Sequence, residues 1–205
     1  LNGVSLQDGT NDTNPWTLQA AAAVNLILVD VTILDCTGAG ATPLIALPNT
    51  DISDTETTNF LVAKRWTGAN STDWTDGGNW FGGAPGATDA VVFDGTSNGT
   101  NAATLNSPTN LRSVIVLSTY SGTATLSQPM ALSGNLNLSG INGGSLDIST
   151  HSLTLNGSGA TLGQSSLAGT GTLIVNASMS ASISTSTIIA PPIQVTNSST
   201  LTLTD

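Results

Sequence analysis

Residues 133–162 read SGNLNLSGINGGSLDISTHSLTLNGSGATL, and this stretch decides the fold. Residues 135–140 and 152–157 share one pattern: a polar residue, an apolar residue, any residue, an apolar residue, a polar residue and a small residue. Alternation of this kind is typical of a short strand with one face in a core, so Leu136 and Leu138 should point inward and Asn137 outward. Gly, Asn and Ser between the two segments favour tight turns.

The same pattern recurs along the chain at an almost constant interval. It returns at residues 172–177 (TLIVNA) and 192–197 (PIQVTN), and the four segments begin 17, 20 and 20 residues apart. Residues 113–118 (SVIVLS) extend the series upstream. A period of about 20 residues that holds two or three short strands is typical of one solenoid coil. If each segment stacks on the one before it, Leu153 and Leu155 continue the column of Leu136 and Leu138.

We therefore predict an all-β fold, a right-handed parallel β-helix (β-solenoid). A β-sandwich is the alternative, because it also contains short alternating strands. Its turns would recur about every 8 to 12 residues, without the longer period seen here.

The composition of the chain excludes several classes of function. Charged residues make up 8% of the chain and hydrophobic residues 39%, so strand-forming and turn-forming polar residues replace the usual charges. The net charge is −10, with Lys64, Arg65 and Arg112 as the basic residues, and we expect no nucleic-acid partner because no basic patch can form. The apolar run at residues 18–31 is too short and too interrupted to span a membrane. Cys36 is the single cysteine, so no disulfide can form within the chain.

Three segments can be distinguished. Residues 1–63 hold short apolar strands between Gly, Pro, Asn and Asp clusters and are predicted to form a short solenoid-like β segment. Residues 64–95, KRWTGANSTDWTDGGNWFGGAPGATDAVVFDG, form a Trp/Gly-rich junction module inserted near the middle of the chain. Residues 96–205 contain the regular solenoid repeats. Strand-like sequence at residues 1–6 and 199–205 predicts open solenoid ends on which further coils can stack.

The tryptophans of the module are candidate ligand-binding residues. Trp66, Trp74 and Trp80 could offer flat apolar faces to sugar rings, which would make the module a carbohydrate-binding site. The alternative is that these indoles pack over the solenoid and seal a junction between blocks of coils, because large aromatic side chains usually bury most of their surface.

The acidic side chains of the module are candidate Ca²⁺ ligands. Asp73, Asp76 and Asn79 are spaced three residues apart, as in a looped cation site, and Asp89 and Asp94 could add oxygens. The alternative is that these side chains form Asx turns with neighbouring backbone N–H groups. No other cofactor is indicated.

The module resembles a recurring element of very large secreted bacterial proteins, in which a W-T-G…D-W…N-W…P…D…V…F motif precedes β-helical repeats. The matching residues are Trp66-Thr67-Gly68, Asp73-Trp74, Asn79-Trp80, Pro85, Asp89, Val91 and Phe93. The repeats that follow resemble the passenger regions of autotransporters and filamentous adhesins. The resemblance implies an extracellular, cell-surface location.

These observations predict a structural building block of an extracellular bacterial surface or fibre protein, which stacks end to end with neighbouring repeats. The alternatives are an adhesin or carbohydrate-binding segment that uses the Trp module, with surface glycans as partners, and a phage-type fibre subunit. We do not expect an enzyme, although many β-helix proteins cleave polysaccharides. The charged or readily charged residues of the solenoid segment are Asp147, His151, Arg112 and Asp205, and none of them forms a recognisable catalytic pair.

Overall fold

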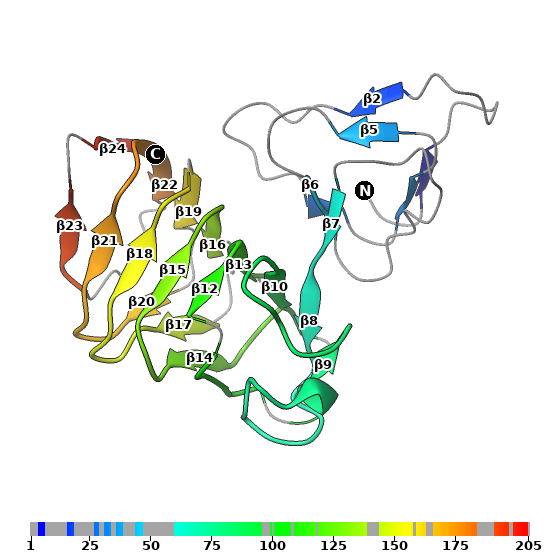
Figure 1. Ribbon diagram of the computed structural model, residues 1–205, viewed down its shortest axis with the longest axis horizontal. Coiled ribbons are helices and arrows are strands. Elements are labelled where there is room, and N and C mark those ends of the chain that lie inside the picture. Colours follow the sequence, from blue (N-terminus) through cyan, green and yellow to red (C-terminus); the bar gives the residue numbers. More distant parts are fainter. Residues whose placement is uncertain are drawn as a thin grey trace. The chain divides into compact units, whose positions relative to one another are not determined.

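The computed structural model is built almost entirely of β-strands, which confirms the predicted all-β parallel β-helix (Figure 1). The chain divides into two units, Leu1–Ala63 and Lys64–Asp205. The structure describes residues 4–6, 16–18, 27–28, 31–33, 36–38, 44–46, 60–95, 99, 101–107, 109–117, 119–138, 144–157, 159–162, 166–183, 191–196 and 199–204.

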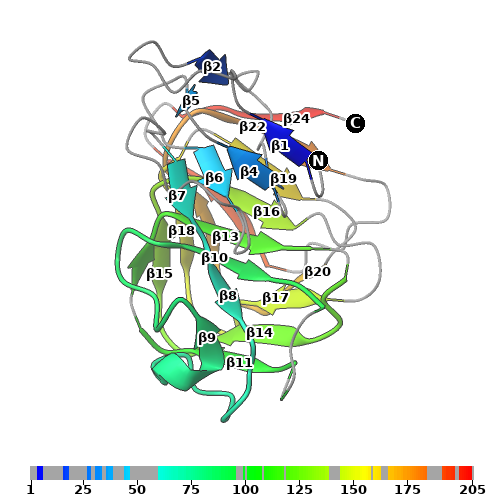
Figure 2. The same ribbon diagram turned by 90° about the vertical axis from the view of Figure 1, so that its right-hand side faces the viewer.

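The second unit is a β-solenoid of about five turns, and its longest sheet runs through every turn. Seven strands of this sheet pair in parallel, one coil on the next, as their stacking in Figure 2 shows. In spatial order these strands are β8 (Lys64–Trp66), β10 (Ala90–Phe93), β13 (Ser113–Val116), β16 (Leu136–Leu138), β19 (Gly159–Leu162), β22 (Met179–Ile183) and β24 (Leu201–Thr204). An eighth strand, β9 (Trp80–Phe81), pairs antiparallel with β8 and ends the sheet.

Two further parallel sheets complete each coil. One contains β11 (Ala103–Leu105), β14 (Thr123–Leu126), β17 (Ser145–Asp147) and β20 (Ser166–Ala168). The other contains β12 (Asn110–Leu111), β15 (Met130–Leu132), β18 (Leu153–Leu155), β21 (Leu173–Val175) and β23 (Ile193–Val195). Hydrogen bonds between neighbouring coils join residues 20 to 24 positions apart, so the period predicted from the sequence is that of a coil.

The first unit also consists of short parallel pairs in its described residues. β1 (Val4–Leu6) pairs with β4 (Val31–Ile33), and β2 (Trp16–Leu18) pairs with β5 (Cys36–Gly38). A third sheet holds β3 (Ile27–Leu28), β6 (Leu44–Ala46) and β7 (Phe60–Val62). The three apolar segments of this sheet are therefore stacked in parallel, as in a solenoid.

Inward side chains of consecutive coils form columns, but one predicted column is wrong. Leu136 pairs with Val114 and Ala160 in the long sheet, whereas Leu153 pairs with Met130 and Leu173 in another sheet. The 17-residue interval between the two aligned segments is shorter than a coil. Two sheets of the solenoid carry the same alternating pattern, so pattern alone does not tell one from the other.

The predicted outward position of Asn137 also needs correction, because its side chain is buried at 5% exposure. Val92 and Ile115 occupy the same register position on the neighbouring strands and are buried too. Val92, Ile115 and Asn137 lie between residues whose side chains point into the core, so their own side chains are on the opposite face of the sheet. Both faces of the long sheet are therefore buried along β10, β13 and β16.

Candidate functional site

The Trp/Gly-rich module lies at the start of the second unit, where the first coil would otherwise present unpaired edges. β8 pairs with β10 in the long sheet, and the chain then forms a loop and a short 3₁₀ helix, η1 (Gly77–Asn79). It returns through β9, which pairs antiparallel with β8. An antiparallel two-residue strand cannot continue a parallel ladder, so β9 closes this edge of the long sheet.

The loop of the module also covers the first strand of a second sheet. Asp73 forms a parallel bridge with Thr104 of β11. The Thr104 N–H donates to the Thr72 carbonyl at 2.7 Å, and the Trp74 N–H donates to the Thr104 carbonyl at 3.3 Å. The backbone groups of β11 that would face a preceding coil therefore bond to the loop instead.

The three tryptophans meet in one aromatic cluster. The ring centroids of Trp66 and Trp80 lie 5.1 Å apart, and those of Trp74 and Trp80 lie 4.5 Å apart, both in edge-to-face geometry. Phe93 of β10 lies within 6.2 Å of all three indoles and 5.2 Å from Tyr120. Offset and edge-to-face pairs at these distances are the favoured arrangements of buried aromatic rings.

This cluster is part of the hydrophobic core. Trp66 and Trp74 are 0% exposed and Trp80 is 5% exposed, and all three contact the inward columns of the first coil. A sugar ring needs an accessible indole face, and these three indoles are buried in this structure. Carbohydrate binding by Trp66, Trp74 and Trp80 stays a prediction. Their packing agrees with one part of the alternative interpretation, that the indoles pack over the solenoid.

Asn79 organises the loop from its centre. Its side-chain oxygen accepts from the N–H groups of Asn70 and Ser71 at 2.8 and 2.9 Å. Its amide group donates to the Ser71 hydroxyl at 2.9 Å and to the Asp73 carbonyl at 2.7 Å. The Asn79 side chain is fully buried, and its four hydrogen bonds fix the conformation of the loop. The next residue, Trp80, adds a further bond, because its Nε1 donates to the Trp74 carbonyl at 2.8 Å.

The two candidate Ca²⁺-binding carboxylates are turned toward the backbone. Asp73 Oδ1 accepts from the N–H and the hydroxyl of Thr75 at 2.9 and 2.8 Å and from the Asn106 amide at 3.1 Å. Asp76 Oδ1 accepts from the Gly78 N–H at 2.9 Å and caps η1. The structure thus brings Asp73, Asp76 and Asn79 into one loop, where Asp73 and Asp76 form the Asx turns of the alternative interpretation and Asn79 bonds to the more distant N–H groups of Asn70 and Ser71. Calcium binding there stays a prediction.

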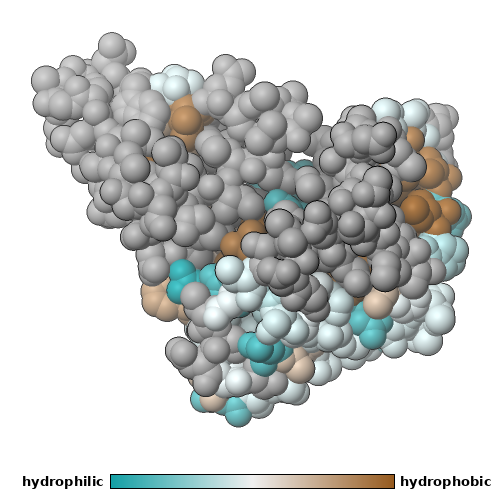
Figure 3. Space-filling view, turned by 180° about the vertical axis from the view of Figure 1, so that it is seen from behind, coloured by the Kyte–Doolittle hydropathy of each residue, from teal (hydrophilic) through white to brown (hydrophobic). Residues whose placement is uncertain are grey.

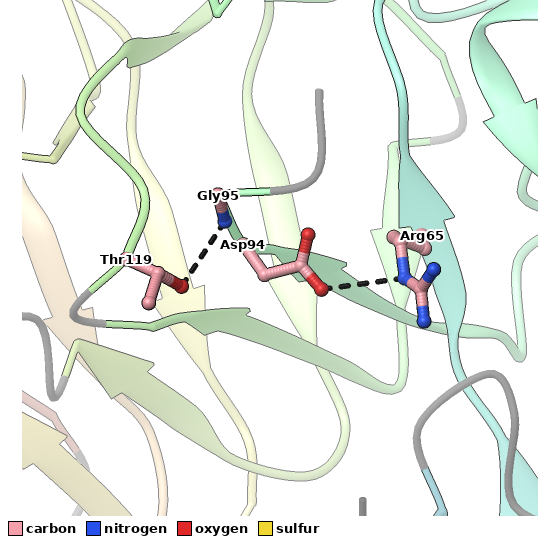
Figure 4. A network of polar contacts seen from close by, with 4 residues as sticks. All are labelled: Arg65, Asp94, Gly95 and Thr119. Carbon is pink, nitrogen blue, oxygen red and sulfur yellow. Dashed lines mark hydrogen bonds and ion pairs between the residues drawn. The ribbon is translucent and has the colours of Figure 1, made fainter. Parts of the chain in front are cut away.

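The other two acidic candidates lie apart from that loop. Asp89 accepts from the Gly86 N–H at 2.9 Å in its own turn. Asp94 forms an ion pair with Arg65 at 3.3 Å, next to Gly95, whose N–H donates to the Thr119 hydroxyl at 3.0 Å (Figure 4). Within the described residues, no group of three or more His, Cys, Asp or Glu side chains is placed to hold a metal ion.

Several residues of this cap were not apparent from the sequence. Tyr120 stands alone in a Ser/Thr/Gly-rich turn, yet its ring packs on Phe93 and its hydroxyl donates to the Asn101 carbonyl. Burial raises the pKa of this hydroxyl above its ordinary value. Asn106, which directly follows β11, donates to the Asp73 carboxylate. Such residues could be found in the sequence by looking for an aromatic or amide residue about one coil after the Trp motif. That search requires the coil length to be known first.

Asp147, one of the ionisable residues of the solenoid segment, also has a structural role. Asp147 Oδ1 accepts from the Ser149 N–H at 2.7 Å in the turn that leads to His151. Ser149 has a positive φ of 53°, which the side-chain hydrogen bond stabilises.

The opposite end of the solenoid is a second candidate surface. β24 is the last strand of the long sheet and β23 the last strand of its own sheet. Ile193 and Val195 of β23 are 40% and 45% exposed, although they continue columns that are buried in the preceding coil.

Comparison with known proteins does not assign the chain to a family. No family model, no curated protein and no solved structure matches it. In the part of the chain that the structure describes, no helix is long and apolar enough to cross a membrane.

Proposed function

We propose that this chain is a structural building block of an extracellular bacterial surface or fibre protein, and that its solenoid stacks end to end with neighbouring repeats. The observation that carries the proposal is the parallel stack itself: about five turns in register, bordered at the start by the Trp/Gly-rich module. The catalytic residues of an enzyme usually gather in a cleft. Here the polar side chains described above form hydrogen bonds within turns and between neighbouring coils.

Polar ladders along the turns support a structural role. Asn176 donates to the side-chain oxygen of Asn156 at 3.0 Å, and Thr196 donates to that of Asn176 at 2.7 Å, so three consecutive coils are joined at one turn. Ser145 and Thr123 are linked in the same way at 3.0 Å. Such ladders stiffen a rod along its axis because each bond ties one coil to the next.

The extracellular assignment rests on the resemblance of the W-T-G…D-W…N-W motif to secreted β-helical proteins. It is tested by adding an antibody against the chain to intact cells of the source organism, with and without external protease. We expect labelling of intact cells that protease removes, while a cytosolic marker protein stays intact. Protein that is labelled only after the cells are lysed would contradict the proposal.

A further inference from the structure

We propose that the outward face of the Trp/Gly-rich module carries a binding site, in which Phe81 and Lys64 take a polysaccharide with isolated uronic-acid carboxylates among neutral sugars. The aromatic ring stacks on a sugar ring, and the ammonium group pairs with the carboxylate. This inference adds a binding function to the proposed structural role and does not depend on it. Three features of the described residues lead to the site, and their chemistry selects the ligand.

The first feature is the exposure of one aromatic ring in a module that buries the others. In the antiparallel pair of β8 and β9, Phe81 is opposite Arg65, and Trp80 is opposite Trp66. Side chains alternate between the faces of a strand, so the two indoles point into the core while Phe81 and Arg65 point outward. Phe81 is 53% exposed, whereas the other five aromatic side chains of the second unit are buried.

An exposed apolar side chain is not by itself a site. The described surface that Figure 3 shows is mostly polar, with hydrophobic residues in a few separate patches. Single apolar residues on such a surface are ordinary and need no ligand to explain them. What distinguishes Phe81 is the set of groups that the fold places around its ring.

The second feature is the pair of cations beside this ring. Lys64 and Arg65 are two of the three basic residues of the chain. The Arg65 guanidinium carbon lies 5.7 Å from the centre of the Phe81 ring, and the Lys64 ammonium group donates to the carbonyl of the next residue, Gly82. Asp94 forms an ion pair with Arg65, but no described carboxylate does so with Lys64. The site therefore carries one positive charge that no described side chain neutralises.

The third feature is the turn that follows Phe81. Gly82 and Gly83 have positive φ values of 94° and 81°, a conformation that favours glycine. A Cβ atom built on Gly82 would lie 3.1 Å from the Lys64 Cδ atom, so glycine at this position lets the lysine side chain lie across the turn. A Cβ atom built on Gly83 would meet no atom within 4 Å. The turn thus holds the ammonium group one residue from the ring and leaves open space for a ligand.

The chemistry of these groups selects the class of ligand. A pyranose ring has an apolar C–H face that packs on an aromatic side chain, and an ammonium group bonds strongly to a carboxylate. A uronic acid combines both groups in one sugar. The net charge of −10 repels densely charged polyanions such as nucleic acids, whereas a single carboxylate among neutral sugars matches the one unpaired charge of Lys64.

The site can be tested by isothermal titration calorimetry of the purified full chain. The acidic probe is a glucuronoxylan oligosaccharide, whose xylose backbone carries single glucuronic-acid groups, and the neutral probe is the same oligosaccharide without those groups. The test variants are Phe81→Ala and Lys64→Gln. The matched controls are Ile193→Ala, which shortens a side chain that is 40% exposed elsewhere, and Arg112→Gln, which removes a positive charge outside the site. Circular dichroism establishes that all four variants keep the wild-type fold.

We expect the wild type and both controls to bind the acidic probe more tightly than the neutral one. Phe81→Ala should raise the dissociation constant of the acidic probe roughly tenfold, because it removes the stacking surface. Lys64→Gln should bind the two probes equally, because it removes the partner of the carboxylate. If Phe81→Ala does not fold, Phe81→Leu replaces it and should show the same loss, since it keeps an apolar side chain but has no ring.

Three results would overturn the proposal. The first is a wild type that does not bind the acidic probe, and the second is a wild type that binds both probes equally. The third is a control variant that loses as much affinity as its matched test variant. None of these results depends on where the protein is located in the cell, so this proposal and the proposed function can fail separately.

Discussion

At the scale of single residues, the indoles of Trp74 and Trp80 differ in one hydrogen bond. Both rings are buried in the same cluster, but Trp80 Nε1 donates to the Trp74 carbonyl at 2.8 Å while Trp74 Nε1 has no partner among the described residues. A buried N–H group without a hydrogen-bond partner lowers the free energy of unfolding, so a substitution that removes this group loses no hydrogen bond.

We therefore predict that Trp80→Phe lowers the free energy of unfolding by about 1 kcal/mol more than Trp74→Phe. The two substitutions remove the same atoms from the same cluster, so each serves as the control for the other. Urea denaturation followed by circular dichroism measures the difference. Equal losses, or a larger loss in Trp74→Phe, would show that the Trp80 hydrogen bond does not hold the cap.

Asp73 makes the cap sensitive to acid. The Thr75 N–H, the Thr75 hydroxyl and the Asn106 amide bond to its carboxylate and hold the pKa of Asp73 below the ordinary value of 3.8. A lowered pKa in the folded state means that the charged carboxylate stabilises the fold above pH 3.8. This stabilisation is lost as the pH falls through the folded-state pKa.

Asp73→Asn should therefore melt at a lower temperature than the wild type at pH 7, and the difference should shrink as the pH falls below 3.8. The reason is that protonation removes from the wild type the same charge that the variant lacks. Melting curves between pH 7 and pH 2 provide the measurement. A difference that is constant over this range would contradict the assigned role of the carboxylate.

At the scale of elements, the close stacking of coils depends on glycine in the turns. A Cβ atom built on Gly157 would lie 1.7 Å from the Gly134 carbonyl oxygen of the preceding coil. The same construction on Gly77 of η1 meets no atom closer than the Ala84 nitrogen at 3.6 Å. The first contact is with backbone, which cannot move aside without shifting a coil.

Gly157→Ala is accordingly expected to destabilise the chain by roughly 1–3 kcal/mol, the cost of overpacking a close contact. Gly77→Ala is the matched control and should stay within about 0.5 kcal/mol of the wild type. Thermal melts of the two variants test this. The stacking of the turns would need revision if both variants melted together.

The strands themselves could be predicted from the sequence far better than their partners. Residues 153–155, 173–175 and 193–195 are strands in one sheet, as their 20-residue spacing indicated. The segment at residues 136–138 has the same pattern but lies in the long sheet. An alternating pattern indicates only that one face of a strand is apolar. It does not indicate to which of the three sheets the strand belongs.

The junction module was harder to interpret because its residues suit two different roles. Exposed indoles and loop carboxylates bind sugars and cations, and the same residues packed inward form a cap. The deciding information is burial, which depends on Phe93 at the end of the module and on Thr104, Asn106 and Tyr120 after it. These contacts join residues 19 to 33 positions apart, from Trp74–Phe93 (93−74) to Asp73–Asn106 (106−73), so local patterns cannot identify them.

At the scale of the whole solenoid, Lys64–Asp205, three parallel sheets run along one stack of about five turns. β9 and the loop around Asp73 occupy the edges of two of these sheets at the start of the stack. The stretch from Ser152 to Thr204 contains no Asp, Glu, Lys, Arg or His, so the net charge of −10 comes from the rest of the chain.

The most direct test of the solenoid and its register is a set of backbone amide and Hα nuclear Overhauser contacts in the labelled chain. We expect cross-strand contacts from Leu136 to Val114 and to Ala160, and from Leu153 to Met130 and to Leu173. Contacts from Leu136 to Leu153, or an antiparallel pattern between these strands, would contradict the parallel three-sheet coil on which the proposed function depends.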